Sequence, residues 1–200
     1  MDRSRTVVPV SLDGDASALI VFRKPSHAPS RTLTPPAELV AATLDSEWTV
    51  TFQEGRGAPA AHDIKGPASW TDSSIAGVKY FSGTASYQTT WTATPQSRPA
   101  GARIMLDLGD VRELADVVVN KQPVGTLWKP PYRVDITKAL GAGTNTIDIR
   151  VTNLWVNRLI GDAQTGAEAV TFTVFPPYTA GAPLRPSGLL GPVRIITSTR

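Results

Sequence analysis

The sequence predicts an all-β sandwich with few, short helical turns, and three observations lead to this prediction. Apolar and polar residues alternate with a period of two along several segments, as strands with one dry and one wet face require. The 17 prolines and 16 glycines mark many turns. Long amphipathic helical periods are missing, and short strands separated by turns at roughly 8–12 residue intervals are typical of a sandwich or barrel.

The N-terminal stretch contains two apolar runs that predict strands, at residues 6–12 and 18–23. Two strands alone rarely fold independently. Residues 1–24 are therefore expected either to join the sandwich as edge strands or to belong to a preceding β domain. A linker is expected over residues 25–43, and the main sandwich domain over residues 44–200.

The strands expected in the main domain follow from the alternation and from β-branched runs. They are residues 48–52, 104–108, 117–119, 124–128, 146–152, 170–174 and 193–196. The runs 117–119 and 124–128 should pair as a hairpin, because Asn120-Lys121-Gln122-Pro123 separates them like a turn. Alternation also predicts that Trp48 and Trp91 belong to the core.

Helical signals are short. Residues 135–141 predict one helical turn, with Asp135 as its N-cap and Gly141 just past its end. The other candidate is residues 34–40, where a threonine precedes two prolines at a possible helix start.

Composition excludes several classes of function. The chain has no cysteine, which excludes disulfides, thiolate catalysis and cysteine-based zinc sites. Its net charge of +3 is spread over scattered basic residues, without the basic stripe that a nucleic-acid binder normally shows. No apolar run approaches the length of a membrane span, and no signal peptide is visible at residues 1–5. We therefore expect no nucleic-acid partner and no membrane partner.

One group of segments resembles a known family. Four segments, in this order along the chain, resemble the sugar-binding jelly-roll domain of family 2 glycoside hydrolases, which has a galactose-binding-like fold. They are Leu106–Val111, Ala115–Asn120, Pro131–Thr137 and Leu140–Ile147. Lys121 departs from that pattern, which prefers glycine in the hairpin turn. Flanking segments are similar to the C-terminal region of family 106 α-L-rhamnosidases; these are Tyr80–Tyr87, Trp128–Tyr132, Asn153–Asp162 and Ser187–Val193.

This resemblance covers residues 44–200, with a weaker likeness over residues 6–24. It implies a jelly-roll sandwich that is a non-catalytic accessory domain of a glycoside hydrolase. Its partners would be a carbohydrate, such as a rhamnose-containing plant or bacterial glycan, and the catalytic barrel of the parent enzyme. The parent would be secreted or periplasmic. The fold often carries a structural Ca²⁺, but no acidic cluster with the spacing of a calcium loop is visible, so we expect no cofactor or metal.

No catalytic pair is apparent in the sequence. Glycoside hydrolysis usually needs two carboxylates roughly 5–10 Å apart, and none of the 17 acidic residues sits in a recognisable catalytic motif. Asp107, Asp116 and Asp148 are expected on solvated strand faces. Ser187 does not lie in the nucleophile elbow of serine hydrolases.

Sugar binding needs an exposed aromatic ring beside fixed polar groups, and two segments fit. Trp128 and Tyr132 flank a stiff Lys-Pro-Pro loop. Trp155 is followed by Asn157, Arg158 and Asp162, just past the strand expected at residues 146–152. The resemblance favours Arg158 and Asp162, because in family 2 the region after the equivalent strand supplies a polar group to the sugar site of the adjacent barrel.

Other interpretations remain open. The tryptophans could pack under loops, and Arg158 with Asp162 could be an exposed ion pair that only braces a loop. The chain would then be a structural spacer. A self-contained polysaccharide-active enzyme is the third alternative, and it would require paired carboxylates in one cleft.

Overall fold

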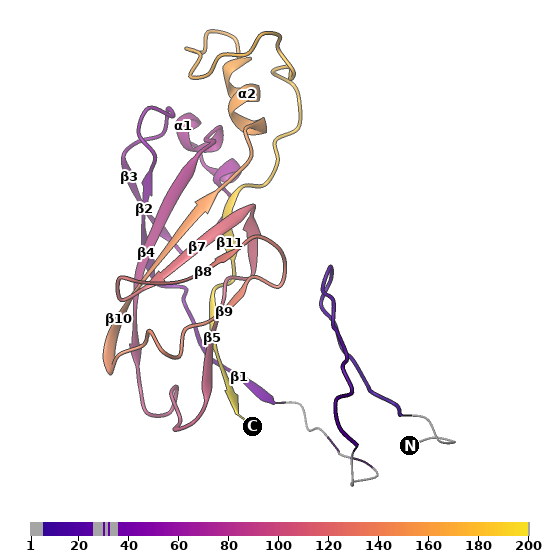
Figure 1. Cartoon of the computed structure of the whole chain (residues 1–200). Coiled ribbons are helices and arrows are strands. Elements are labelled where there is room, and N and C mark those ends of the chain that lie inside the picture. Colours follow the sequence, from indigo (N-terminus) through magenta and orange to yellow (C-terminus); the bar gives the residue numbers. More distant parts are fainter. Residues whose placement is uncertain (1–5, 26–29, 31, 33–35, 200) are drawn as a thin grey trace.

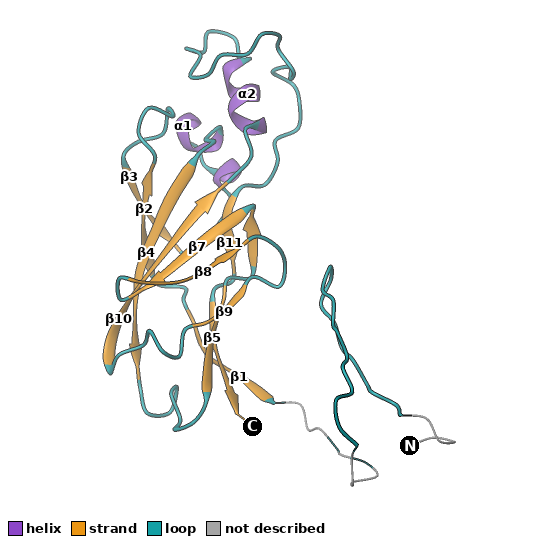
Figure 2. Cartoon of the chain, viewed as in Figure 1, coloured by secondary structure: helices purple, strands orange, loops and turns teal. Residues whose placement is uncertain are grey.

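The strands of this chain form two antiparallel sheets that pack face to face around one core. The computed structural model describes residues 6–25, 30, 32 and 36–199 (Figures 1 and 2). Side chains along the central strands alternate between buried and exposed, as the period-two pattern predicts. The predicted all-β sandwich is confirmed.

The larger sheet has six strands, all joined by antiparallel pairs. Its centre is a ten-residue pairing of β4 and β10, which sets their registers from Gly143 opposite Ala93 to Thr152 opposite Thr84. The strands, in spatial order, are β3 (Ala61–Lys65), β2 (Glu47–Phe52), β4 (Thr84–Ala93), β10 (Gly143–Thr152), β7 (Leu114–Val119) and β8 (Gln122–Leu127).

The opposing sheet has four strands, and a two-stranded ribbon extends the sandwich at one end. In spatial order the four strands are β1 (Ala37–Thr43), β12 (Arg194–Thr199), β5 (Arg103–Asp107) and β9 (Arg133–Asp135). The ribbon pairs β11 (Gly188–Gly191) with β6 (Asp110–Arg112).

The hairpin predicted around residues 120–123 is present as β7 and β8, with Val119 opposite Gln122. Asn120 and Lys121 both have positive φ, 50° and 66°, as the two-residue turn of a twisted hairpin requires. The side-chain amide of Asn120 donates to Asn145 Oδ1 at 2.7 Å, which connects the turn to the start of β10. Lysine in place of the family's glycine thus leaves the hairpin intact.

Helices are few and short, as expected. They are the 3₁₀ turn η1 (Trp70–Asp72), α1 (Ala76–Lys79) and α2 (Val156–Asp162). The expected helical turn at residues 135–141 is a hydrogen-bonded turn, in which Asp135 Oδ1 accepts from the Thr137 amide at 3.0 Å. Among the described residues, no helix is long and apolar enough to cross a membrane.

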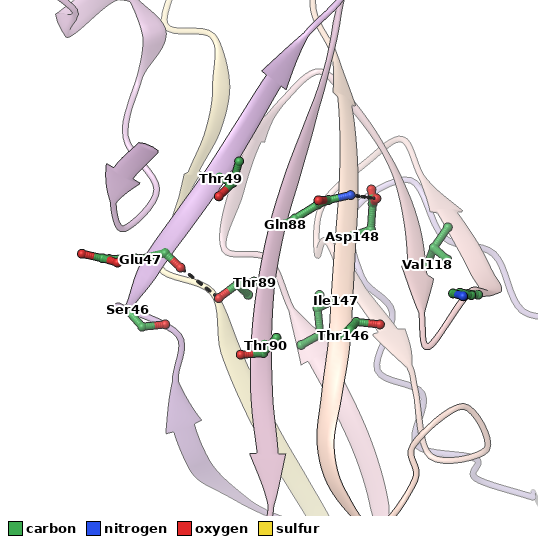
Figure 3. A pocket seen from close by; sticks show the side chains of 11 residues that line it. Ser46, Glu47, Thr49, Gln88, Thr89, Thr90, Val118, Thr146, Ile147 and Asp148 are labelled. Atoms are coloured by element: carbon green, nitrogen blue, oxygen red, sulfur yellow. Dashed lines mark hydrogen bonds between the residues drawn. The ribbon is translucent and has the colours of Figure 1, made fainter. Parts of the chain in front are cut away.

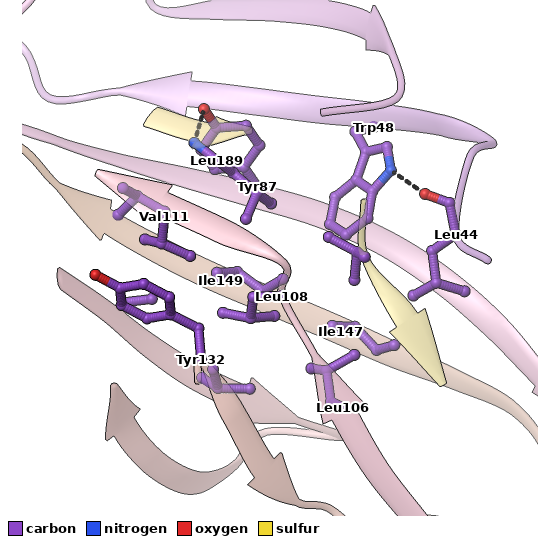
Figure 4. Close-up of a cluster of buried hydrophobic side chains, with 14 of the residues drawn as sticks. Leu44, Trp48, Tyr87, Leu106, Leu108, Val111, Tyr132, Ile147, Ile149 and Leu189 are labelled. Atoms are coloured by element: carbon purple, nitrogen blue, oxygen red, sulfur yellow. Dashed lines mark hydrogen bonds between the residues drawn. The ribbon is translucent and has the colours of Figure 1, made fainter. Parts of the chain in front are cut away.

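The core lies between the sheets and is rich in aromatic and branched side chains (Figure 4). Trp48 and Tyr87 are fully buried, and each satisfies its polar atom. Trp48 Nε1 donates to the Leu44 carbonyl at 3.1 Å, and the Tyr87 hydroxyl accepts from the Leu189 amide at 3.1 Å. Burial raises the pKa of Tyr87 far above its ordinary value, so the hydroxyl stays neutral. Trp91 is also buried, as predicted.

Two local predictions were wrong, the helix at residues 34–40 and the strand at residues 170–174. The helix expected at residues 34–40 is largely replaced by strand β1, which pairs with β12; residues 34 and 35 lie outside the described residues. This pairing also extends the sandwich into the expected linker. The two N-terminal apolar runs, 6–12 and 18–23, have no strand assignment and pair with no strand of the sandwich, so their place in a β domain stays a prediction. Residues 170–174 form a loop that pairs with no strand, and Phe172 and Val174 are exposed.

Candidate functional site

The best candidate site lies at the end of the sandwich that carries α1 and α2 (Figure 1). Helix α2 begins four residues after β10 ends. Asn153 fixes the path of the chain between β10 and α2, because its side chain donates to the Phe81 carbonyl at 2.9 Å and accepts from the Gly83 amide at 2.9 Å. The Ser82 hydroxyl then donates to the Leu154 carbonyl and accepts from the Arg158 amide. These bonds join two segments that are distant in sequence, Tyr80–Tyr87 and Asn153–Asp162.

Asn157 is 2% exposed and holds the far end of the loop that follows α2. Its amide group donates to the Arg185 carbonyl and to Ser187 Oγ, both at 2.7 Å. Its oxygen accepts from the Arg185 amide at 2.8 Å. Because these partners use the whole side chain, Asn157 positions the loop and is not available to a ligand, contrary to our expectation.

Arg158 and Asp162 form a buried ion pair, with Arg158 Nε 2.9 Å from Asp162 Oδ1. The pair lies on α2, and the expectation of an exposed loop pair was wrong. Asp162 also accepts from the backbone amides of Val170 and Thr171, at 3.0 and 2.9 Å, and from the Thr171 hydroxyl. Burial raises the pKa of Asp162, but the hydrogen bonds from Thr171 and Val170 and the charge of Arg158 outweigh it, so the pKa lies below its usual range.

The Arg158 guanidinium borders a hollow of about 490 Å³ with walls of glycine and alanine. Gln164 and Glu168 contribute its other long polar side chains. A Cβ at Gly161 would lie 2.5 Å from Arg158 Nη2, so glycine is required for the guanidinium to occupy this place. Among the described residues, the Arg158 guanidinium donates no hydrogen bond, and its buried Nε meets Asp162 as an ion pair without an aligned hydrogen bond.

A second hollow, of about 580 Å³, adjoins the first, and Val170 lines both. Trp155 and Phe172 contribute its aromatic surface. Trp155 is 44% exposed, and the Arg56 guanidinium lies 4.7 Å from its ring centroid. The two hollows together place an aromatic ring and guanidinium groups at one end of the sandwich, a combination that suits the C–H face and the hydroxyls of a sugar.

The other predicted aromatic segment lies elsewhere, between β8 and β9. Trp128 is 68% exposed, as a stacking platform requires. Tyr132 is buried in the core (Figure 4). Its hydroxyl donates to the Glu113 carbonyl at 3.2 Å. Tyr132 therefore has no exposed ring for a sugar. The structure does not join this segment to the α2 end, since the hollows that Trp128 and Trp155 line share no residue.

Sequence reasoning did not identify a hollow of about 780 Å³ on the outer face of the six-stranded sheet (Figure 3). Threonines at alternate exposed positions of β4 and β10 were the signal for it. Asp148 lies there and accepts from Ser86 Oγ at 2.8 Å and from Gln88 Nε2 at 2.9 Å. These bonds occupy its carboxylate, and no aromatic ring lines the hollow.

Asp107 and Asp116, two of the acidic strand residues considered above, are also occupied within the fold. Asp107 was expected on a solvated face but is 8% exposed, and it accepts from the Gly109 amide and from Arg133 Nε, both at 2.9 Å. Asp116 accepts a hydrogen bond from Thr126 Oγ1. Within residues 6–25, 30, 32 and 36–199, no group of three or more His, Asp or Glu side chains is arranged to hold a metal ion.

These features define a class: an antiparallel β-sandwich domain whose loops, at one end, gather polar and aromatic side chains. Residues 71–176, more than half of the chain, match the family described as "Glycosyl hydrolase 2 galactose-binding domain-like". The chain belongs to this family of glycoside hydrolase domains, as the resemblance in its sequence predicted.

Similar proteins are much longer than this chain. The rhamnosidase structure from Novosphingobium sp. PP1Y matches 88% of the chain at 50% identity, with a TM-score of 0.83, over 17% of its own length. A provisionally named β-glucuronidase of Formosa agariphila is 38% identical over 151 residues, which are 64% of this chain and 13% of that protein. The β-D-glucuronidase structure from Dictyoglomus thermophilum matches 85% of the chain and 29% of its own, at 17% identity with a TM-score of 0.57, and so shares the fold.

Proposed function

We propose that this chain is a non-catalytic accessory domain of a longer glycoside hydrolase, and that its α2 end contacts the glycan at the neighbouring catalytic domain. The observation that carries the proposal is Arg158, a buried cation that borders a hollow and whose guanidinium donates no hydrogen bond to the described residues. Buried donors are normally satisfied, so a glycan hydroxyl or a group of the neighbouring domain is expected to accept from it.

The ion pair with Asp162 prepares Arg158 for this task. A planar guanidinium donates along fixed directions, and groups that are fixed before a ligand arrives cost less entropy on binding. Helix α2 and the 2.9 Å contact supply that fixation. Trp155, at the adjoining hollow, offers the apolar surface on which a pyranose ring can stack.

The glycan class follows from the relatives. The similarity to a rhamnosidase at 50% identity supports a rhamnose-containing glycan and an α-L-rhamnosidase-like parent. A secreted or periplasmic location of that parent stays a prediction of the resemblance. The isolated chain should not hydrolyse aryl α-L-rhamnosides, because the carboxylate pair is expected in the catalytic domain; turnover that one Asp or Glu substitution abolishes would support the self-contained enzyme instead.

A second function, the structural spacer, has its own support. Asn157 and Asp162 make all of their hydrogen bonds within the loop that they brace. The discriminating experiment measures kcat/KM of the longer enzyme carrying Arg158→Lys, which keeps the charge but lacks the planar fork. We expect a loss of more than tenfold, about 1.4 kcal/mol. Wild-type activity in this variant, with a normal melting temperature, would favour the spacer.

A further inference from the structure

The N-terminal segment 6–23 exposes a large apolar surface for a segment of its length. Eight large apolar side chains between residues 7 and 22 are exposed, among them Leu19 at 91%, Phe22 at 71% and Val7 at 68%. Figure 1 shows this segment as two extended stretches, joined by a tight turn, that stand away from the sandwich. The turn is closed by a hydrogen bond from the Ala16 amide to the Asp13 carbonyl at 3.1 Å.

The segment pairs with no strand of the sandwich, since the described strands pair only with one another. The segment is instead held at its turn, where Lys129 Nζ donates to the Gly14 carbonyl at 2.7 Å. Lys129 follows Trp128, which is 68% exposed, and Asp13, Ala16 and Trp128 border a shared hollow of about 580 Å³.

The apolar pattern of residues 6–23 indicates what kind of surface covers this segment. Residues 18–22 are apolar on both faces, which is typical of a strand that is buried on both sides. Val8, Val10 and Leu12 alternate, as in a strand with one buried face. A hairpin alone is only marginally stable in water, so the segment fits an existing sheet better than it fits solvent.

We propose that residues 6–23 form a β-hairpin that completes the sheet of an adjacent β domain of the same, longer polypeptide. The loop Trp128–Pro131 is the contact of the sandwich with that domain, and Trp128 packs against it. Two further observations support a neighbouring domain over a second copy of this chain. The similar rhamnosidase extends well beyond the matched region, which is 17% of its length. The Lys129 bond fixes the turn beside the sandwich of the same chain.

Hydrogen–deuterium exchange with mass spectrometry tests the proposal, on the 200-residue chain and on the longer polypeptide with its preceding domain. Amides of residues 6–23 should exchange within seconds in the chain alone and at least a hundredfold more slowly in the longer polypeptide. Fast exchange of these amides in both proteins would overturn the proposal. Protection in the chain alone that rises with protein concentration, together with a dimer in light scattering, would also overturn it and assign the hairpin to a second copy.

Two substitutions add a readout of stability. Val21→Asp should leave the melting temperature of the 200-residue chain within about 1 °C, because Val21 is 57% exposed and does not belong to the core of the sandwich. In the longer polypeptide the same change should lower the first unfolding transition by several degrees, and Trp128→Ala should lower it less. No shift with Val21→Asp in the longer polypeptide would contradict the proposal.

Discussion

Arg158 and Asp162 lie one helical turn apart on α2, with Nε 2.9 Å from Oδ1, and their side chains are 7% and 11% exposed. The carboxylate anchors the backbone at Val170 and Thr171. The guanidinium borders a hollow and donates no hydrogen bond to Gln164 or Glu168, the other long polar side chains of its lining. One partner of the pair therefore organises the fold, while the other is available to a ligand.

Removal of the Arg158 side chain should destabilise the domain strongly. Arg158→Ala leaves a buried carboxylate without its cation, and such losses cost about 3–5 kcal/mol. The matched control is Arg103→Ala, which breaks an exposed pair with Asp135 of the same 2.9 Å length and should cost about 0.2–1 kcal/mol. Urea unfolding of both variants measures the difference. Equal costs would show that the Arg158 pair is no more important to the fold than a surface pair.

Stability should fall in acid, in part because of Asp162. The unfolded chain takes up this proton near the ordinary pKa of 3.8, whereas the folded pKa is lower. The contribution of Asp162 is therefore fully present above pH 3.8 and is lost as the pH falls through the folded pKa. Asp135, whose pKa is also lowered, acts in the same direction. Urea unfolding between about pH 6 and pH 2.5 should show a shallower acid loss for Asp162→Asn than for wild type. Parallel curves of stability against pH for Asp162→Asn and wild type would contradict this prediction.

The two aromatics around the Lys-Pro-Pro loop should respond differently to alanine. Tyr132→Ala removes a core ring and should cost about 3–5 kcal/mol. Trp128→Ala removes an exposed ring and should stay within about 1 kcal/mol of wild type in this chain. Thermal unfolding of the two variants measures the contrast. A large cost at Trp128 would mean that the ring packs on the sandwich itself.

Gly188 should tolerate no side chain. Its φ is +96°, and a Cβ there would lie 2.7 Å from the Trp70 ring and from the Tyr87 hydroxyl. Gly188→Ala should therefore cost about 2–4 kcal/mol, from backbone strain and overpacking together. Gly55→Ala is the matched control, because φ is +71° there and nothing lies within 4 Å of the added Cβ. Its cost should be about 1 kcal/mol. Equal melting temperatures of the two variants would show that close packing does not restrict which residue can occupy position 188.

Much of the fold was predictable because its strands have one buried and one exposed face. The alternation in β2, β5 and β10 indicated both the strands and the core. The pattern failed where a strand-like segment lacks a partner. Residues 170–174 alternate as well as β2 does, yet Asp162 holds their backbone as a loop. Pairing partners are a long-range property, and local alternation does not encode them.

The site was predictable in part. A charged pair four residues apart pointed to Arg158 and Asp162, although not to the burial of both side chains. Tyr132 resembled a loop aromatic because two prolines precede it, but the chain turns inward at this point and its ring enters the core. The roles of Asn157 and Gly161 depend on contacts with Arg185 and Tyr80, which no local pattern reveals.

A calorimetric titration of the 200-residue chain with rhamnose-containing oligosaccharides tests most directly whether the α2 end contacts a glycan, as we claim. Trp155 and Trp128 are both exposed tryptophans, at 44% and 68%, so their alanine variants form a matched pair. We predict that wild type binds, that Trp155→Ala weakens binding more than tenfold, about 1.4 kcal/mol, and that Trp128→Ala leaves the Kd within about twofold. No binding by wild type, or equal affinity in all three proteins, would contradict the claim.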